Sequence, residues 1–191
     1  MAVLDDRTLL DILRDDKRAY GRRPWIEPGF QALAVHRWAT LQARRPSPFP
    51  LRLATNAIQK FLTFITRAVY GIEITPGSDI GRRLRIAHQG GIVLGAERIG
   101  DDCVVRQNVT IGQAVVAGPR PVVGDRVDIG AGAVIVGGVT IGNETKIGPN
   151  AVVTSNISPN SLVVTPPARV LRRPAAFRAP EGNGVSEKQR D

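Results

Sequence analysis

Apolar residues in the first third of the chain recur at the spacing of amphipathic helices. Between Val3 and Tyr70 they fall into three stripes with intervals of three and four residues, the period of one helix face. The stripes are Leu9, Leu10 and Leu13; Phe30, Leu33, Ala34, Arg37, Trp38 and Leu41; and Leu53, Ile58, Phe61, Leu62, Ile65 and Val69. Prolines and glycines interrupt the pattern at 21–29 and 46–50. We therefore predict three helices in residues 1–70.

After Gly71 the period of the aliphatic residues becomes six. Two runs keep this step, separated by a slip of one residue: Ile74, Ile80, Ile86 and Ile92, and then Ile99, Val105, Ile111, Ala117, Val123, Ile129, Ile135, Ile141, Ile147 and Val153. Neither an α-helix nor a flat strand has a period of six. Ordinary hairpins would need turn pairs such as Asn-Gly at regular intervals, and these are absent. The pattern is typical of a parallel β-helix, whose triangular coils consist of three short strands with aliphatic residues pointing inward.

These patterns predict a mainly β protein in three parts: a helical region over 1–70, a β-helix over 71–170, and a polar, partly disordered tail over 171–191. The hydrophobic content of 42% supports a core, while 5% aromatic residues, 20 glycines and 14 prolines fit a repetitive β architecture better than a helical bundle. We expect Cys103, the single cysteine, to be a buried structural residue.

The charge pattern bears on possible partners. The net charge of +9 is carried mainly by dispersed arginines and would suit a phosphorylated cofactor. No nucleic-acid-binding motif or aromatic stacking platform accompanies these arginines, so we expect no nucleic-acid partner. With no long apolar run and a lone thiol, we expect a cytoplasmic protein without membrane association.

Two segments resemble a known family: IGRRLRIAHQGGIVLGAERIGDDCVVRQNVTIG and VDIGAGAVIVGGVTIGNETKIGPNAVV. They are similar to the serine acetyltransferase family of left-handed β-helix acyltransferases, and the match extends from about Asp15 to Arg169. The resemblance implies a left-handed coil, in contrast to the usual right-handed crossover. It also implies a homotrimer and acetyl-CoA as co-substrate, bound in the groove between neighbouring coils. The family's docking to a partner in cysteine synthesis uses a C-terminal isoleucine; this sequence ends in Asp191, so we expect no such complex.

The resemblance assigns the catalytic residues. Acetyl transfer to a hydroxyl needs a base for the hydroxyl proton, and a neutral imidazole suits this task near pH 7. The family's catalytic histidine corresponds to His88, and Glu73 stands where the family usually has the aspartate that orients the ring. One coil of about eighteen residues should bring these two residues to adjacent coils near the same edge. Alternatively, His88 caps a corner by hydrogen bonding to the backbone. We expect His36 to be a packing or surface residue.

On the acceptor side, the sequence departs from the serine pattern. Ala87 replaces the aspartate that precedes the family's histidine, and Arg120 stands at or near a second histidine. An arginine there could still bind a carboxylate in a bidentate manner. An acidic contact to serine corresponds to Asp16, or to Asp15 if the gap shifts; either residue could instead be an ordinary charge on a helix surface.

On the donor side, Gln113 stands where a glycine normally lines the acetyl site, and Ala131 and Pro149 should flank the acetyl-CoA groove one coil apart. Cations that could meet the CoA phosphates, or simply be solvated, are Lys146, Arg169, Arg172 and Arg173. Asp101 and Asp102 lack a His or Cys at useful spacing, so we expect no metal.

The sequence therefore favours an acetyl-CoA-dependent O-acetyltransferase with L-serine as the first acceptor. A second possibility is the same chemistry on a sugar, a polysaccharide precursor or another biosynthetic hydroxyl. A third is a β-helix scaffold without catalytic activity.

Overall fold

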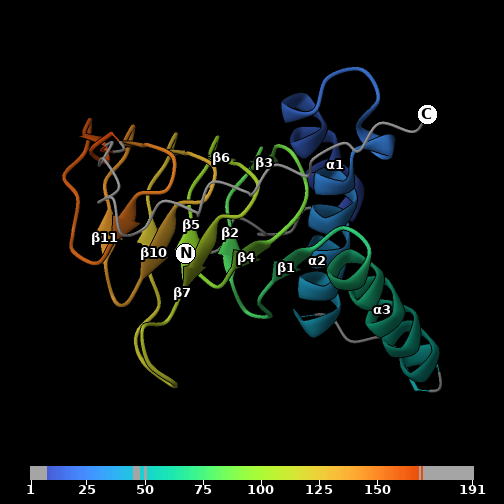
Figure 1. Ribbon diagram of the computed structural model, residues 1–191. Helices are drawn as coiled ribbons and strands as arrows, with labels where there is room; N and C mark the ends of the chain where they lie inside the picture. Colours follow the sequence, from blue (N-terminus) through green and yellow to red (C-terminus); the bar gives the residue numbers. More distant parts are fainter. Residues whose placement is uncertain (1–7, 45–47, 50, 168, 170–191) are drawn as a thin grey trace, which may run out of the picture.

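Three helices precede a parallel β-helix, as predicted, in the computed structural model, which describes residues 8–44, 48–49, 51–167 and 169. The helices are α1 (Leu9–Asp16), α2 (Pro28–Arg44) and α3 (Leu51–Ala68), with short 3-10 turns at Lys17–Ala19 and Pro24–Ile26. The Thr8 side chain caps α1 and α2 begins at a proline, both common helix starts. Figure 1 shows the helices gathered at the end of the β-helix where the first coil lies.

Among the described residues, fourteen short strands form three parallel sheets, one on each face of the β-helix. Face A contains β1 (Ile72–Ile74), β4 (Ile92–Leu94), β7 (Thr110–Gly112), β10 (Val134–Val136) and β13 (Val152–Val153). Face B contains β2 (Asp79–Ile80), β5 (Arg98–Ile99), β8 (Val122–Val123) and β11 (Thr140–Ile141). Face C contains β3 (Arg85–Ile86), β6 (Val104–Val105), β9 (Asp128–Ile129), β12 (Lys146–Ile147) and β14 (Leu162–Val163).

The core consists of columns of aliphatic side chains that stack from coil to coil. On face B, Ile80, Ile99, Val123 and Ile141 are paired in register and buried. The columns of the other two faces are Ile74, Leu94, Ile111, Ile135 and Val153, and Ile86, Val105, Ile129, Ile147 and Val163. Small side chains such as Cys103 and Ala133 fill the corners between them. A step of six residues is therefore usual, because each coil has three strands and must place their aliphatic residues over those of the coil before.

Two assignments in the six-residue pattern were wrong. Leu94, not Ile92, continues the column of face A, so the step from Ile86 to the next column position is eight residues, whereas the next coil takes six from Val105 to Ile111. The corner after Ile86 therefore contains two extra residues. Ile92 is also buried, which is why the sequence pattern did not separate it from Leu94.

The second wrong assignment is Ala117, which is exposed and lies outside the strands. It belongs to a loop between β7 and β8 that projects from the body (yellow in Figure 1). The columns connect Ile111 to Val123, twelve positions later, so the coil has gained one extra period without a strand. Because the insertion equals the repeat length, the hexapeptide phase continues across the loop and hides it.

The helical region is fixed to the first coil by buried polar contacts. Asp16 at the end of α1 is fully buried and accepts hydrogen bonds from the Arg37 side chain, at 3.0 and 3.3 Å, and from the Arg83 backbone N–H at 2.8 Å. Arg37 also donates to the carbonyl oxygens of Ile80 and Gly81. Losing one partner of such a buried pair leaves an uncompensated charge, at a cost of about 3–5 kcal/mol. Docking of the helices is therefore strongly specified.

A second contact lies next to the enlarged corner. The Tyr20 hydroxyl accepts the backbone N–H of Ile86 at 2.9 Å. Gly29 in α2 packs so tightly here that a Cβ on it would lie against the Ile86 carbonyl oxygen and 2.8 Å from the Ile86 Cβ. The helical region thus holds the residue that leads into this corner.

Gly29→Ala tests this close approach. In an open helix, replacing Gly by Ala stabilises by roughly 0.5–1 kcal/mol. Here the added methyl group meets backbone, so we expect a net loss of about 1–3 kcal/mol in the free energy of unfolding. Gly112→Ala is the control, because a Cβ there has no neighbour within 4 Å, and it should change stability by less than about 0.5 kcal/mol. Urea denaturation measures both values; equal effects of the two substitutions would contradict the packing described.

Candidate active site

His88 lies in the enlarged corner between faces C and A, which we call the C–A corner (87–91, 106–109, 130–133 and 148–151). The residue is exposed and has a φ of 60°, a conformation that Asn108 and Asn150 repeat on later coils. Gly91, with a φ of 63°, leaves room for the Asn108 side chain, which a Cβ would displace. Within the described residues no hydrogen bond holds the His88 ring, so nothing there supports the capping alternative. The ring is accessible to a ligand.

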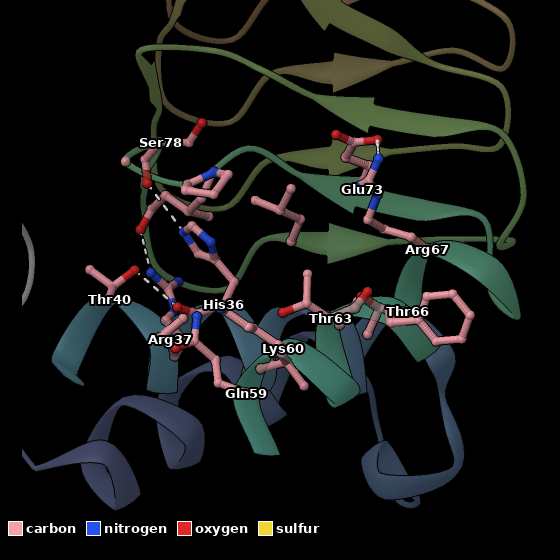
Figure 2. Close-up of a pocket in the computed structure, with 18 of the residues that line it drawn as sticks. His36, Arg37, Thr40, Gln59, Lys60, Thr63, Thr66, Arg67, Glu73 and Ser78 are labelled. Atoms are coloured by element: carbon pink, nitrogen blue, oxygen red, sulfur yellow. Dashed lines mark hydrogen bonds and ion pairs between the residues drawn. The ribbon is translucent and has the colours of Figure 1, made fainter. Parts of the chain in front are cut away.

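Glu73 lies on β1, and its strand neighbour on β4 is Val93, five residues after His88. Glu73 therefore lies on the first strand of face A, and His88 lies in the corner that leads into the second strand. In this structure, however, the Glu73 carboxylate pairs with Arg67 of α3 at 3.2 Å (Figure 2), and no hydrogen bond joins it to His88. Arg67 was not predicted from the sequence, because its pairing with Glu73 depends on how α3 crosses the first coil.

Ala131 and Pro149 share the C–A corner with His88. The Asn150 N–H donates to the Ala131 carbonyl at 2.9 Å, and Gly130 packs against Pro149, so these residues occupy successive coils of one edge. Gln107 lies between them and His88, and its buried Oε1 atom has no hydrogen-bond partner among the described residues. Such an atom costs about 1–3 kcal/mol unless a ligand or water satisfies it. Gln107 was not predicted from the sequence, where its only sign was a polar side chain at a corner.

Gln113 and Arg120 lie at the other edge of face A, which we call the A–B corner (75–78, 95–97, 112–121 and 136–139). The Gln113 side chain donates to the Gly118 carbonyl at 2.6 Å within the projecting loop. Arg120 donates to the carbonyl of Gly95 at 3.1 Å, to the Ser78 hydroxyl at 2.9 Å and to the carbonyl of Ala96. Within one chain, face A separates both residues from His88.

The remaining acceptor-side candidates lie near the junction of α1 and the first coil. Ala87 is half-buried next to His88 and donates its N–H to the Val105 carbonyl at 2.8 Å. Asp16 is not a helix-surface charge, because both of its oxygens accept hydrogen bonds inside the protein. Asp15 pairs with Arg18 and Arg83. Contacts of Asp16 and Ala87 with an acceptor stay predictions.

Two of the four cations expected to meet the CoA phosphates lie within the described residues. Lys146 is exposed on β12, shortly before the C–A corner of its coil, and Arg169 is exposed near the end of the described chain. Arg172, Arg173 and the predicted tail lie outside the described residues. Asp101 pairs with Arg82, and Asp102 with Arg83, whose hydrogen bonds lower the pKa of Asp102. Within the described residues no three potential metal ligands gather.

Two further titratable side chains, His36 and Cys103, are buried in the structure. Burial, followed by the charge of Arg37, lowers the pKa of His36 to about 4, so this ring is neutral and packs with a 3.1 Å hydrogen bond to the Ser78 carbonyl. The packing alternative for His36 is therefore confirmed. Burial raises the pKa of Cys103 to about 11, which keeps the thiol protonated and inert as a nucleophile.

None of the helices in the described part of the chain is long and apolar enough to cross a membrane.

The chain is similar in sequence to known hexapeptide-repeat transferases and serine acetyltransferases. The family model for the bacterial transferase hexapeptide (six repeats) matches residues 120–155. The serine acetyltransferase of Mycobacterium tuberculosis is 38% identical over 169 residues, covering 83% of this chain and 70% of the relative. The serine acetyltransferase of Helicobacter pylori strain 26695 is 36% identical over 169 residues, covering 85% and 93%.

Solved structures give the same result. Serine acetyltransferase isoform 3 of Entamoeba histolytica, crystallised in complex with cysteine, superposes with a TM-score of 0.71 at 28% identity. The alignment covers 86% of this chain but only 62% of that one, so this chain spans less than two thirds of its length. The soybean apoenzyme superposes with a TM-score of 0.69 at 30% identity, covering 87% of this chain and 70% of the plant protein.

Proposed function

Since the chain belongs to the serine acetyltransferase family, we propose that it is an O-acetyltransferase that transfers the acetyl group of acetyl-CoA to the hydroxyl of L-serine. The proposal rests on one observation. The exposed His88 lies on the C–A corner, and Ala131 and Pro149 follow it on later coils of the same corner. A long, thin co-substrate fits such an edge, with its reactive end at the histidine. This function suits a cytoplasmic protein, where acetyl-CoA is available and a lone thiol stays reduced.

His88 acts as the general base. Its neutral ring accepts the acceptor's hydroxyl proton while the oxygen attacks the thioester carbon. The carbon–sulfur bond then breaks, and the protonated ring returns its proton to the departing CoA sulfur. Acetyl transfer is thus direct, and no acetylated enzyme forms. Glu73 orients and stabilises the protonated ring once its carboxylate turns from Arg67 toward His88.

The C–A corner binds the donor. The Gln107 amide oxygen, buried here without a partner among the described residues, can accept an N–H of the pantetheine arm once its side chain turns outward, which would remove the penalty of its burial. Ala131 and Pro149 continue this path, and Lys146 and Arg169 meet the phosphates. Arg172 adds charge from the part of the chain that is not described. Gln113 reaches the acetyl site only from a neighbouring subunit, because it lies at the A–B corner.

One observation favours a second candidate, the same chemistry on a sugar or another biosynthetic hydroxyl, including polysaccharide precursors. Ala87 offers no carboxylate to an amino group, and the Nε and Nη2 donors of Arg120 are used by Ser78, Gly95 and Ala96, which leaves only Nη1 for a ligand. Of the two contacts that a serine acceptor would want, one is missing and the other is reduced among this chain's described side chains.

His88→Ala tests whether the protein is an enzyme with His88 as its base or a scaffold without catalytic activity. Loss of the general base should lower turnover by roughly two to four orders of magnitude. Thiol release from acetyl-CoA is measured with L-serine, homoserine and nucleotide sugars as acceptors. Arg126→Gln is the control, because it breaks only an exposed pair with Glu144 at 2.6 Å on a distant corner and should keep normal turnover. Near-normal turnover of His88→Ala would exclude the mechanism.

A homotrimer would bring the two corners together. Face A separates them within a chain, but a neighbouring copy can place its A–B corner against the C–A corner of the first. An outer face of α3 also favours assembly: Leu51, Ala54, Ile58, Phe61 and Ile65 follow the alternating three- and four-residue spacing of a helix-packing seam. Leu51, Ile58 and Phe61 on this face are 57%, 52% and 61% exposed, which is unfavourable unless another surface covers them.

Phe61→Asp tests the assembly. Sedimentation equilibrium should give the mass of three chains for the unaltered protein and a smaller mass for the variant, because a charge on the seam cannot be buried without a partner. Asn56→Asp adds the same charge on another side of α3 and should leave the trimer intact. A monomeric unaltered protein would contradict the proposal.

A further inference from the structure

A large groove opens between α2, α3 and the first coil of the β-helix. Its volume is about 1460 Å³, and it extends from the ends of the two helices to Glu73 and Val93 on face A. Figure 2 shows side chains of α3 facing the first coil across it, among them Gln59, Lys60 and Thr63. Free serine would fill only a small part of this space, since pockets of roughly 300–1,000 Å³ already hold drug-sized ligands.

The lining of the groove as a whole exposes more apolar than polar surface, but α3 presents mainly polar side chains to it. A helix that packs on a protein body normally turns its apolar stripe inward. Here the side chains of Thr55, Gln59 and Thr63 line the groove, whereas Ile58 and Phe61 point away and are exposed. Polar side chains facing an open space of this size are suited to a water-soluble ligand with several hydroxyl groups.

The charges around the groove favour an anion. Four cations, Arg44, Arg52, Lys60 and Arg67, stand against the two carboxylates of Glu73 and Asp79. Two other groups on the lining add no net charge, because Arg37 is neutralised by Asp16 and His36 is neutral in its buried position. Lys60 has no ion-pair partner among the described residues, and Arg67 has only Glu73. These two side chains are seven residues, about two helical turns, apart on the same side of α3.

The same groove reaches the catalytic residues. Arg67 and Glu73 both line it, and their 3.2 Å pair is partly exposed, with 58% and 40% of the two side chains accessible. A phosphate group near Lys60 would compete with Glu73 for the Arg67 guanidinium, which binds phosphate well through paired N–H groups. Glu73 would then be free to turn toward His88.

We propose that this groove binds a phosphorylated, hydroxyl-bearing small molecule, whose phosphate contacts Lys60 and Arg67 and whose binding releases Glu73 to orient His88. Binding stands independently of the catalytic activity. Only the effect on His88 rests on the proposed function.

Isothermal titration calorimetry of the full chain tests binding with glucose 6-phosphate, AMP, inorganic phosphate and glucose as probes. Glucose 6-phosphate or AMP should bind, and whichever binds tells whether a sugar or a nucleoside carries the phosphate. Lys60→Gln and Arg67→Gln should each weaken binding at least tenfold, while Arg126→Gln, the same loss of charge far from the groove, should not. The site is overturned if neither phosphorylated compound binds, if phosphate or glucose alone binds as tightly, or if Arg126→Gln weakens binding equally.

Thiol release from acetyl-CoA tests the link to Glu73. The bound compound should raise kcat several-fold in the unaltered protein. Arg67→Gln should already have a raised kcat in the absence of the compound, and adding the compound should not raise it further. An unaltered kcat in both cases would overturn the link. Absence of turnover in every variant, with binding retained, would instead overturn the proposed acetyltransferase function and leave the binding site standing.

Discussion

Stacking of aliphatic side chains from coil to coil is the constraint on which the rest of the structure depends. Each column position, such as Ile99 between Ile80 and Val123, is buried only if the coils above and below place their own residues in register. A coil therefore cannot change its strands without breaking three ladders at once. Extra residues are tolerated only at corners, where they leave the columns undisturbed. Two of the corners that deviate, at His88 and at the loop after β7, are also where His88, Gln113 and Arg120 lie.

The helical region makes the first of these corners well defined. Tyr20 and Gly29 hold Ile86 immediately before it, and the buried Asp16–Arg37 pair fixes the helices on the first coil. An exposed histidine in a left-handed backbone conformation would otherwise sit at the unsupported end of a repeat array. The same docking sets the direction of α3, which places Arg67 beside Glu73 and leaves an apolar seam on the outer side. One buried ion pair thus influences the base, its carboxylate partner and the proposed contact between subunits.

The sequence predicted the fold because the hexapeptide period directly reflects the columns. It could not distinguish Leu94 from Ile92, because both are aliphatic and both are buried. It also missed the loop at Ala117, because an insertion of six residues preserves the phase. A periodic pattern does not predict contacts between distant segments. Asp16 could have been a surface charge by sequence, but in the structure it is buried and paired with Arg37, twenty-one residues later. The period predicted that Ala131 and Pro149 lie one coil apart, whereas their position on the same edge as His88, and the pairing of Glu73 with Arg67, required the structure.

The most direct test of the account is the imidazole region of the NMR spectrum, because the chain contains only two histidines. With the pKa of His36 lowered to about 4 by burial, its signal should stay in the neutral position from pH 7.5 to 5.5 and should not respond to CoA or L-serine. The His88 signal should shift when CoA or L-serine is added, because that ring stands where donor and acceptor meet. Ligand-dependent shifts of the His36 signal, with the His88 signal unmoved, would contradict the assignment of the C–A corner as the active site.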